Sequence, residues 1–193
     1  MCGILFSRGF NKVKSLNGLS ELIHRGPDAI DSIQAGKDFF GHVRLSILDL
    51  HERSSQPFSN EEGDVLIFNG EIYNHKNLRD TLELKHNIIF KTNGDTEVLF
   101  WILKLKLWDL FDKINGMWSF VFLAQDGDVF FSRDRFGIKP MFLYKSNSKL
   151  VIASEVGSIK KMVDLRVNKE RIVNFIYRPS SVIGHNSFYH DVE

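Results

Sequence analysis

The sequence is poor in the residues that mark several familiar classes of protein. Its 193 residues include one cysteine, Cys2, which excludes an intramolecular disulfide and a cysteine-rich metal site. Acidic and basic residues nearly balance, at a formal net charge of +1, so no basic field points to nucleic acid or to a membrane as a partner. No apolar run approaches the roughly 18 residues of a membrane span. Arg8, Lys12 and Lys14 also break the layout of a signal peptide. These absences predict a cytoplasmic protein.

Two kinds of ligand site are missing as well. The seven histidines show no HxH or HxxxH spacing, so we predict no metal site. No GxxxxGK[ST] run is present, so we expect no nucleoside triphosphate site and no cofactor in this domain. Phenylalanine is abundant instead, with 17 residues, and its large buried area favours a dense core of sheets and helices.

Hydrophobic periodicity predicts an α+β fold. We expect strands at 4–6, 39–50, 64–69, 117–123, 129–132, 141–144 and 150–153, and helices at 16–23, 75–85, 95–107, 155–162 and 168–178. The order is not the alternation of a βαβ protein, and it provides enough strands for two packed sheets covered by helices. From about Pro179 the periodicity weakens, which indicates a linker, the start of a further region or a disordered C-terminus.

Cys2 is the first candidate for chemistry because of its position. If Met1 is removed, Cys2 carries a thiol and a free α-amine whose ordinary pKa is about 7.7–8.0. One residue would then supply both a nucleophile and its base. The alternative is a small residue that ends as buried filler.

Three further polar groups are candidates for a site. Arg44 lies within the expected strand 39–50. It would bind a substrate carboxylate through two parallel hydrogen bonds, or simply face solvent. Asn69 and Gly70 offer two adjacent N–H donors, as in an oxyanion hole, or form an ordinary turn. Asp95 would bind a substrate ammonium or only begin a helix.

Two charged loops favour structural roles. Within His24–Asp28 we expect Arg25 and Asp28 to staple the loop by an ion pair. The run around Asp134 indicates a buried ionic network or an interface.

Together these segments resemble a known family, the glutaminase domain of asparagine synthetase, which is a class II glutamine amidotransferase of the N-terminal-nucleophile hydrolase type. The resemblance covers about residues 1–160. The matching segments run in family order as MCGI, HRGPD, GHVRLSI, QPF, FNGEIYN, GDTE, NGM, RDRFGIKP and ASE.

The resemblance implies a four-layer αββα sandwich and a role for each residue of the site. Cys2, freed of Met1, would be the nucleophile, and its α-amine would be the base. Asn69 and the Gly70 N–H would form the oxyanion hole. The substrate L-glutamine would meet a set of residues that the resemblance places around it: Arg44 at its α-carboxylate, Leu45, Ser46, Ile47 and Leu48 along the wall, and Glu71 and Asp95 near its α-ammonium.

The resemblance also implies a partner for the glutaminase. We expect residues 1–162 to be the amidotransferase domain, and 163–193 to be a linker or the start of a C-terminal synthetase domain that this chain lacks. ATP and magnesium would belong to that domain, which would consume the ammonia, and a homodimer is left open. The alternatives are a non-catalytic regulatory or docking domain of the same fold, an amidotransferase for another acceptor such as a sugar acid, and a hydrolase for another amide.

Overall fold

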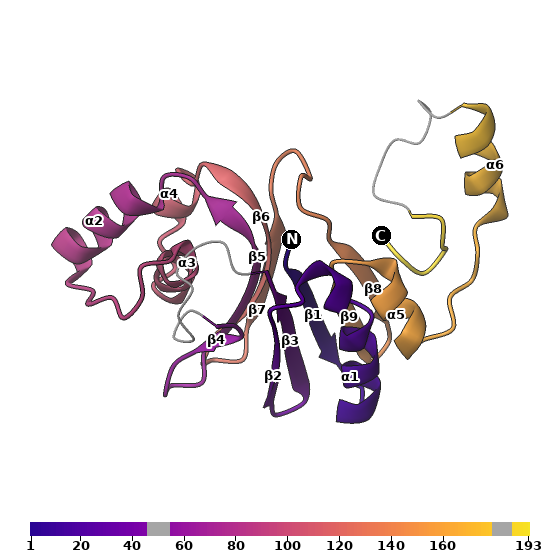
Figure 1. The fold of residues 1–193 in the computed structure, drawn as a ribbon, viewed down its shortest axis with the longest axis horizontal. Coiled ribbons are helices and arrows are strands. Elements are labelled where there is room, and N and C mark those ends of the chain that lie inside the picture. The colour runs from indigo at the N-terminus through magenta and orange to yellow at the C-terminus, as the bar shows by residue number, and fades with distance from the viewer. Residues whose placement is uncertain (46–54, 179–186) are drawn as a thin grey trace.

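The computed structural model describes residues 1–45, 55–178 and 187–193, and two antiparallel sheets form its centre (Figure 1). The first sheet has the order β2 (Ala29–Ala35), β3 (Asp38–Arg44), β1 (Gly3–Arg8), β9 (Lys149–Ala153) and β8 (Phe142–Ser146). The second has the order β4 (Phe58–Ser59), β5 (Val65–Ile72), β6 (Gly116–Leu123) and β7 (Val129–Arg133).

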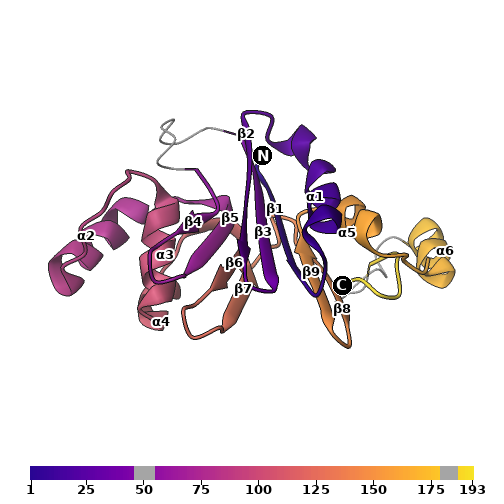
Figure 2. The same cartoon turned by 90° about the horizontal axis from the view of Figure 1, so that it is seen from below.

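Helices cover the outer face of each sheet, as Figures 1 and 2 show from two sides. The first sheet carries α1 (Lys12–Ser20) and α5 (Val156–Met162), with a short 3-10 turn at Ile23–Arg25. The second carries α2 (His75–His86), α3 (Asp95–Lys104) and α4 (Trp108–Phe111). The remaining helix, α6 (Lys169–Tyr177), lies beyond α5 and apart from both sheets (Figure 1).

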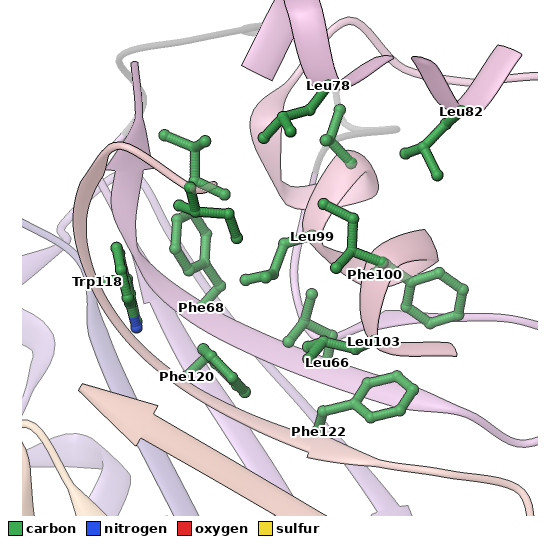
Figure 3. Close-up of a cluster of buried hydrophobic side chains, with 14 of the residues drawn as sticks. Leu66, Phe68, Leu78, Leu82, Leu99, Phe100, Leu103, Trp118, Phe120 and Phe122 are labelled. Atoms are coloured by element: carbon green, nitrogen blue, oxygen red, sulfur yellow. The ribbon is translucent and has the colours of Figure 1, made fainter. Parts of the chain in front are cut away.

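Three separate apolar cores show why these layers form. Successive strand residues point to opposite faces, so Ile4 and Phe6 join the core between the sheets, whereas Leu5 joins the core beneath α1 and α5. A third core packs α2 and α3 onto the second sheet (Figure 3). This arrangement confirms the four-layer αββα sandwich.

The register brings the ends of two central strands together. Gly3 pairs with Val43 and Ile4 with His42, so Cys2 lies just beyond the end of β1 and next to Arg44. In the second sheet Asn69 pairs with Ser119, and Gly70 with Trp118. Cys2, His42 and Arg44 have the parity of Ile4 and Phe40, and Asn69 has the parity of Ile67, so these side chains share the layer between the sheets.

The structure corrects several expected elements. Strand β2 was not expected, because its sequence AIDSIQA is that of a mostly exposed edge strand. The expected strand 39–50 ends at Arg44, and its residues 46–50 lie outside the described residues. Helix α1 runs from Lys12 to Ser20 with Asn11 as its N-terminal cap, so it begins and ends earlier than the expected helix at 16–23.

Asn69 and Gly70 form no turn. They continue β5 to Ile72, and Gly70 has no positive φ. A Cβ on Gly70 would meet the Met117 carbonyl oxygen and would lie 2.5 Å from a ring carbon of Phe68. Glycine is therefore present for close packing and not for a left-handed backbone.

The C-terminal segment 187–193 packs onto the first sheet. Leu143 and Glu193 exchange two backbone hydrogen bonds of 2.9 Å, and Val192 is buried with the core under α5. Within the described residues no helix is long and apolar enough to cross a membrane. In the same ranges no three metal-ligating side chains gather into a possible metal site.

Candidate functional site

One cleft opens between the two sheets and contains most of the expected site. Cys2, Arg44, Leu45, Gly70, Glu71 and Asp95 all line it. Asn69 is the buried neighbour of Gly70. The remaining expected residues, Ser46, Ile47 and Leu48, lie outside the described residues.

The Cys2 thiol is held by the first residue after β3. The Leu45 N–H donates to Sγ at 3.4 Å, and the thiol donates to the Leu45 carbonyl at 3.6 Å. Leu45 is the first residue beyond β3, and both its N–H and its carbonyl bind the sulfur. The thiol is half-buried and faces the cleft, which leaves it accessible to a small molecule.

The backbone of Cys2 is fixed by a residue that the sequence assigned to a loop staple. Arg25 Nε donates to the Cys2 carbonyl at 3.0 Å, while its NH1 donates to Glu155 Oε1 at 2.8 Å. His24 Nε2 lies 3.0 Å from the same Glu155 oxygen. Burial would raise the pKa of Glu155, but the hydrogen bonds from Arg25 and His24 outweigh it and hold that pKa below its ordinary value. Arg25 thus forms an ion pair with Glu155, a residue far along the chain, and the same guanidinium positions Cys2.

Arg44 is the positive group of the cleft. It is 8% exposed and its NH1 donates to Ser55 Oγ at 3.3 Å. A guanidinium in so buried a place is costly unless it is paired with acceptors. Its placement beside Cys2 suits the carboxylate of a small substrate.

The backbone of β5 presents a row of donors to the cleft side. Phe68 N–H donates to Gln56 Oε1 at 2.6 Å and Ile72 N–H donates to Asp95 Oδ2 at 2.8 Å, both on the side away from β6. Strand groups alternate in direction, so the Gly70 N–H points to this same side. Asn69 is 1% exposed, and its side-chain Nδ2 has no hydrogen-bond partner in the described part of the chain. A buried donor without a partner is a group that a ligand can satisfy.

The buried carboxylate of the cleft is Asp95, the first residue of α3. The pKa of Asp95 is raised, chiefly by burial and also by the charge of Glu71. The hydrogen bond from the Ile72 N–H and the charge of His75 act in the opposite direction and lower it. The wall beside it is held by Glu97, whose carboxylate accepts from the Lys91 and Thr92 N–H groups at 3.0 and 2.7 Å. A substrate ammonium placed beside Asp95 would stabilise its charged form and offset the free-energy cost of burying the carboxylate.

Sequence reasoning missed three supporting residues. The Gln56 side chain binds the N–H and the carbonyl of Phe68, the backbone groups that a longer β4 strand would otherwise pair with. Glu97 anchors a cleft wall, although the sequence suggested only an acidic first turn. His42 lines the cleft and is 1% exposed. A histidine within the otherwise largely apolar strand run Phe39–Val43 is a signal that could have singled out His42.

The loop after β7 is also different from expectation. Among the residues that the structure describes, Asp134 forms no ion pair; it accepts backbone N–H groups of Trp118, Phe136, Ile138 and Lys139 at 2.9–3.2 Å. Burial would raise its pKa, but these four donors outweigh it and lower the pKa of Asp134. The carboxylate organises the turn after β7.

Comparisons with known proteins agree with this geometry. A sequence model of the family described as "Glutamine amidotransferase domain" matches residues 1–193. Asparagine synthetase [glutamine-hydrolyzing] 2 of Bacillus subtilis is 42% identical over 147 residues, which cover 75% of this chain and 19% of that protein. Putative asparagine synthetase [glutamine-hydrolyzing] 2 of Methanocaldococcus jannaschii is 33% identical over 198 residues, which cover 90% of this chain and 37% of that protein. The chain therefore spans well under half the length of these relatives.

Solved structures share the fold at lower identity. Glutamine phosphoribosylpyrophosphate amidotransferase from Bacillus subtilis, in complex with ADP and GMP, superposes with a TM-score of 0.67 at 22% identity. The match covers 83% of this chain and 43% of that one. A structure described as the allosteric regulatory enzyme of purine biosynthesis gives a TM-score of 0.69, also at 22% identity.

Proposed function

Because this chain belongs to the family of glutamine amidotransferase domains, we propose that its cleft hydrolyses L-glutamine to L-glutamate and ammonia at Cys2. One observation supports this most: a thiol, a buried cation and a buried carboxylate line one cleft, as Cys2, Arg44 and Asp95. Arg44 would bind the α-carboxylate, and Asp95 with Glu71 the α-ammonium. The pair of opposite charges selects an amino acid over a simple amide.

The chemistry follows from the groups around the thiol. Removal of Met1, whose side chain is 56% exposed, would free the Cys2 α-amine to take the thiol proton. The sulfur attacks the carboxamide carbon, and the oxyanion binds Asn69 Nδ2 and the Gly70 N–H. The C–N bond then breaks, and the nitrogen leaves as ammonia with the proton from the amine. Water hydrolyses the thioester to glutamate, so each step uses only groups of this chain and the solvent.

We extend the proposal to the whole protein because its relatives are named as glutamine-hydrolysing asparagine synthetases. Residues 1–162 would be the glutaminase and 163–193 a connection to a synthetase domain that uses ATP and magnesium to join the ammonia to aspartate. The single free thiol suits the cytoplasm, where cysteines stay reduced.

A steady-state assay tests the proposed reaction. The purified chain should release glutamate and ammonia from L-glutamine, and Cys2→Ala should abolish that release. Asn69→Ala should lower kcat by about 100-fold or more, because an oxyanion donor is lost. Glutamine hydrolysis that survives Cys2→Ala would contradict the mechanism.

A further inference from the structure

His42 is a buried residue of the cleft for which the reaction above has no role. It is 1% exposed in the middle of β3, on the face that looks between the sheets. Its Nε2 has no hydrogen-bond partner in the described ranges of the chain. A buried polar atom without a partner is rare in proteins and calls for an explanation.

The state of the ring follows from its surroundings. Burial is the main cause that lowers the pKa of His42 to about 3, while a hydrogen bond to the Phe68 backbone raises it and the charge of Arg44 lowers it. A bond that raises the pKa of an imidazole is one that the ring donates. Since Nε2 has no partner, Nδ1–H is the donor to the Phe68 carbonyl, and Nε2 presents a bare acceptor lone pair.

The position of the ring shows what this acceptor can meet. His42 pairs with Ile4, so it is the diagonal neighbour of Cys2 on the same face of the sheet. At its other end it contacts Phe68, the residue before Asn69. The ring thus reaches from β3, the strand paired with β1 and its nucleophile, to β5, the strand of the proposed oxyanion hole. The reacting carboxamide must lie between these two strands.

Glutamine brings two groups that can donate a hydrogen bond, the α-ammonium and the carboxamide NH2. The α-ammonium is matched by Asp95, which is bound to the far end of β5 at Ile72. The donor left for His42 is the carboxamide NH2. Gln56, another polar side chain that lines the cleft, already uses both ends of its amide on Phe68.

We infer that His42 is a specificity-determining residue, whose Nε2 accepts a hydrogen bond from the carboxamide NH2 of glutamine. The inference rests on the proposed function. A neutral acceptor recognises an amide and disfavours an acid derivative that has no N–H at that position, since the lone pair would then stay unpaired. His42 takes no part in proton transfer.

A pair of substrates tests this role. L-glutamine and L-glutamate γ-methyl ester share the α-ammonium, the α-carboxylate and a γ-carbonyl, and only glutamine has the N–H. We expect His42→Phe to lower the ratio of kcat/KM for glutamine to kcat/KM for the ester by about tenfold, the worth of one hydrogen bond. His42→Gln, which keeps one donor and one acceptor, should recover part of that preference. Gln56→Leu is the matched control, because it loosens Phe68 without removing the acceptor and should lower both rates alike.

Each outcome decides between two readings. An equal loss for both substrates in His42→Phe would overturn the inference and assign His42 a structural role only. If His42→Phe does not fold by circular dichroism, His42→Leu is measured in its place, with the same criterion. Hydrolysis of glutamine by the parent chain establishes the proposed function separately, and a parent that hydrolyses neither substrate contradicts that function and the inference together.

Discussion

At the scale of single residues, the site consists of polar groups that the fold keeps buried before any substrate arrives. Asp95 is 6% exposed, Arg44 8% and Asn69 1%. Each of these burials costs free energy that a well-placed ligand can recover. This is the usual relation between a binding site and stability: the groups that bind substrate are not the groups that stabilise the fold.

Asp95→Asn should separate these two effects. Asparagine keeps an oxygen for the Ile72 N–H but removes the charge, so glutamine binding should be lost while the midpoint of thermal unfolding at pH 7 stays equal or rises. The pKa of Asp95 is raised from 3.8, so the folded protein holds this proton more tightly than the unfolded chain does. The stability of the parent relative to Asp95→Asn should therefore fall as pH rises above 3.8. Thermal unfolding of both proteins between pH 4 and pH 8 would measure this difference in stability. A parent whose stability rises relative to that of the variant as pH rises would contradict the prediction.

Gly70→Ala should damage both stability and activity. The added methyl would press on the Met117 carbonyl and on the Phe68 ring, at a cost of about 1–3 kcal/mol in the free energy of unfolding. Gly157→Ala is the control: it lies in α5, where an added Cβ would make only an ordinary contact, 3.8 Å from Glu21 Oε2, and alanine should stabilise the helix by about 0.5–1 kcal/mol. Urea titration of both variants measures the difference, and a Gly70→Ala protein as stable as the parent would disprove the packing argument.

At the scale of elements, the sequence predicts interior strands and helices better than edges. Helix α3 falls within the expected helix at 95–107 because Val98, Leu99, Ile102 and Leu103, all of them buried, recur at helical spacing. Strand β2 escaped because an exposed edge strand has little apolar alternation. The pair Asn69–Gly70 was expected to turn because its local preference is strong, but a neighbouring backbone and an aromatic ring decide its conformation.

The candidate site shows the same limit. The resemblance named residues that would meet the substrate, and the structure places all of those it describes, except the buried Asn69, in the lining of one cleft. It did not reveal Arg25 on the Cys2 carbonyl, Gln56 on Phe68 or Glu97 on the cleft wall. These contacts join positions far apart in the chain, so no local pattern of the sequence carries them.

The turn after β7 provides a prediction at this scale. Asp134→Ala should leave four backbone N–H groups without their acceptor and lower the free energy of unfolding by about 2–4 kcal/mol. The pKa of Asp134 is lowered, so its contribution is present at neutral pH and is lost as pH falls below 3.8. Asp126→Ala, at an exposed ion pair with Lys106, should change the unfolding midpoint little. Equal effects of the two substitutions in a denaturant titration would contradict the role given to Asp134.

At the scale of the whole molecule, the two sheets act as a frame that holds the proposed reacting groups between them. Cys2 belongs to one sheet and Asn69 with Gly70 to the other, so the site exists only while the layer between the sheets stays packed. The C-terminal segment adds to the frame by pairing with β8 and burying Val192.

Val192→Asp should therefore weaken the whole fold. A carboxylate placed in the core under α5 would cost more than about 3 kcal/mol in unfolding free energy. Val173→Asp is the matched control, since Val173 is 49% exposed on α6 and the same substitution there should matter little. Similar unfolding midpoints for the two variants would show that residues 187–193 do not support the sheet.

The central claim, a nucleophilic N-terminal cysteine in a glutamine cleft, is tested most directly by covalent labelling. The chain is incubated with 6-diazo-5-oxo-L-norleucine, a glutamine mimic whose electrophilic carbon a thiolate attacks with loss of nitrogen gas, and the product is mapped by peptide mass spectrometry. The account predicts one adduct, on a Cys2 that has lost Met1, and protection from labelling by excess L-glutamine. An adduct at another residue, or no adduct on a folded chain that begins at Cys2, would contradict it.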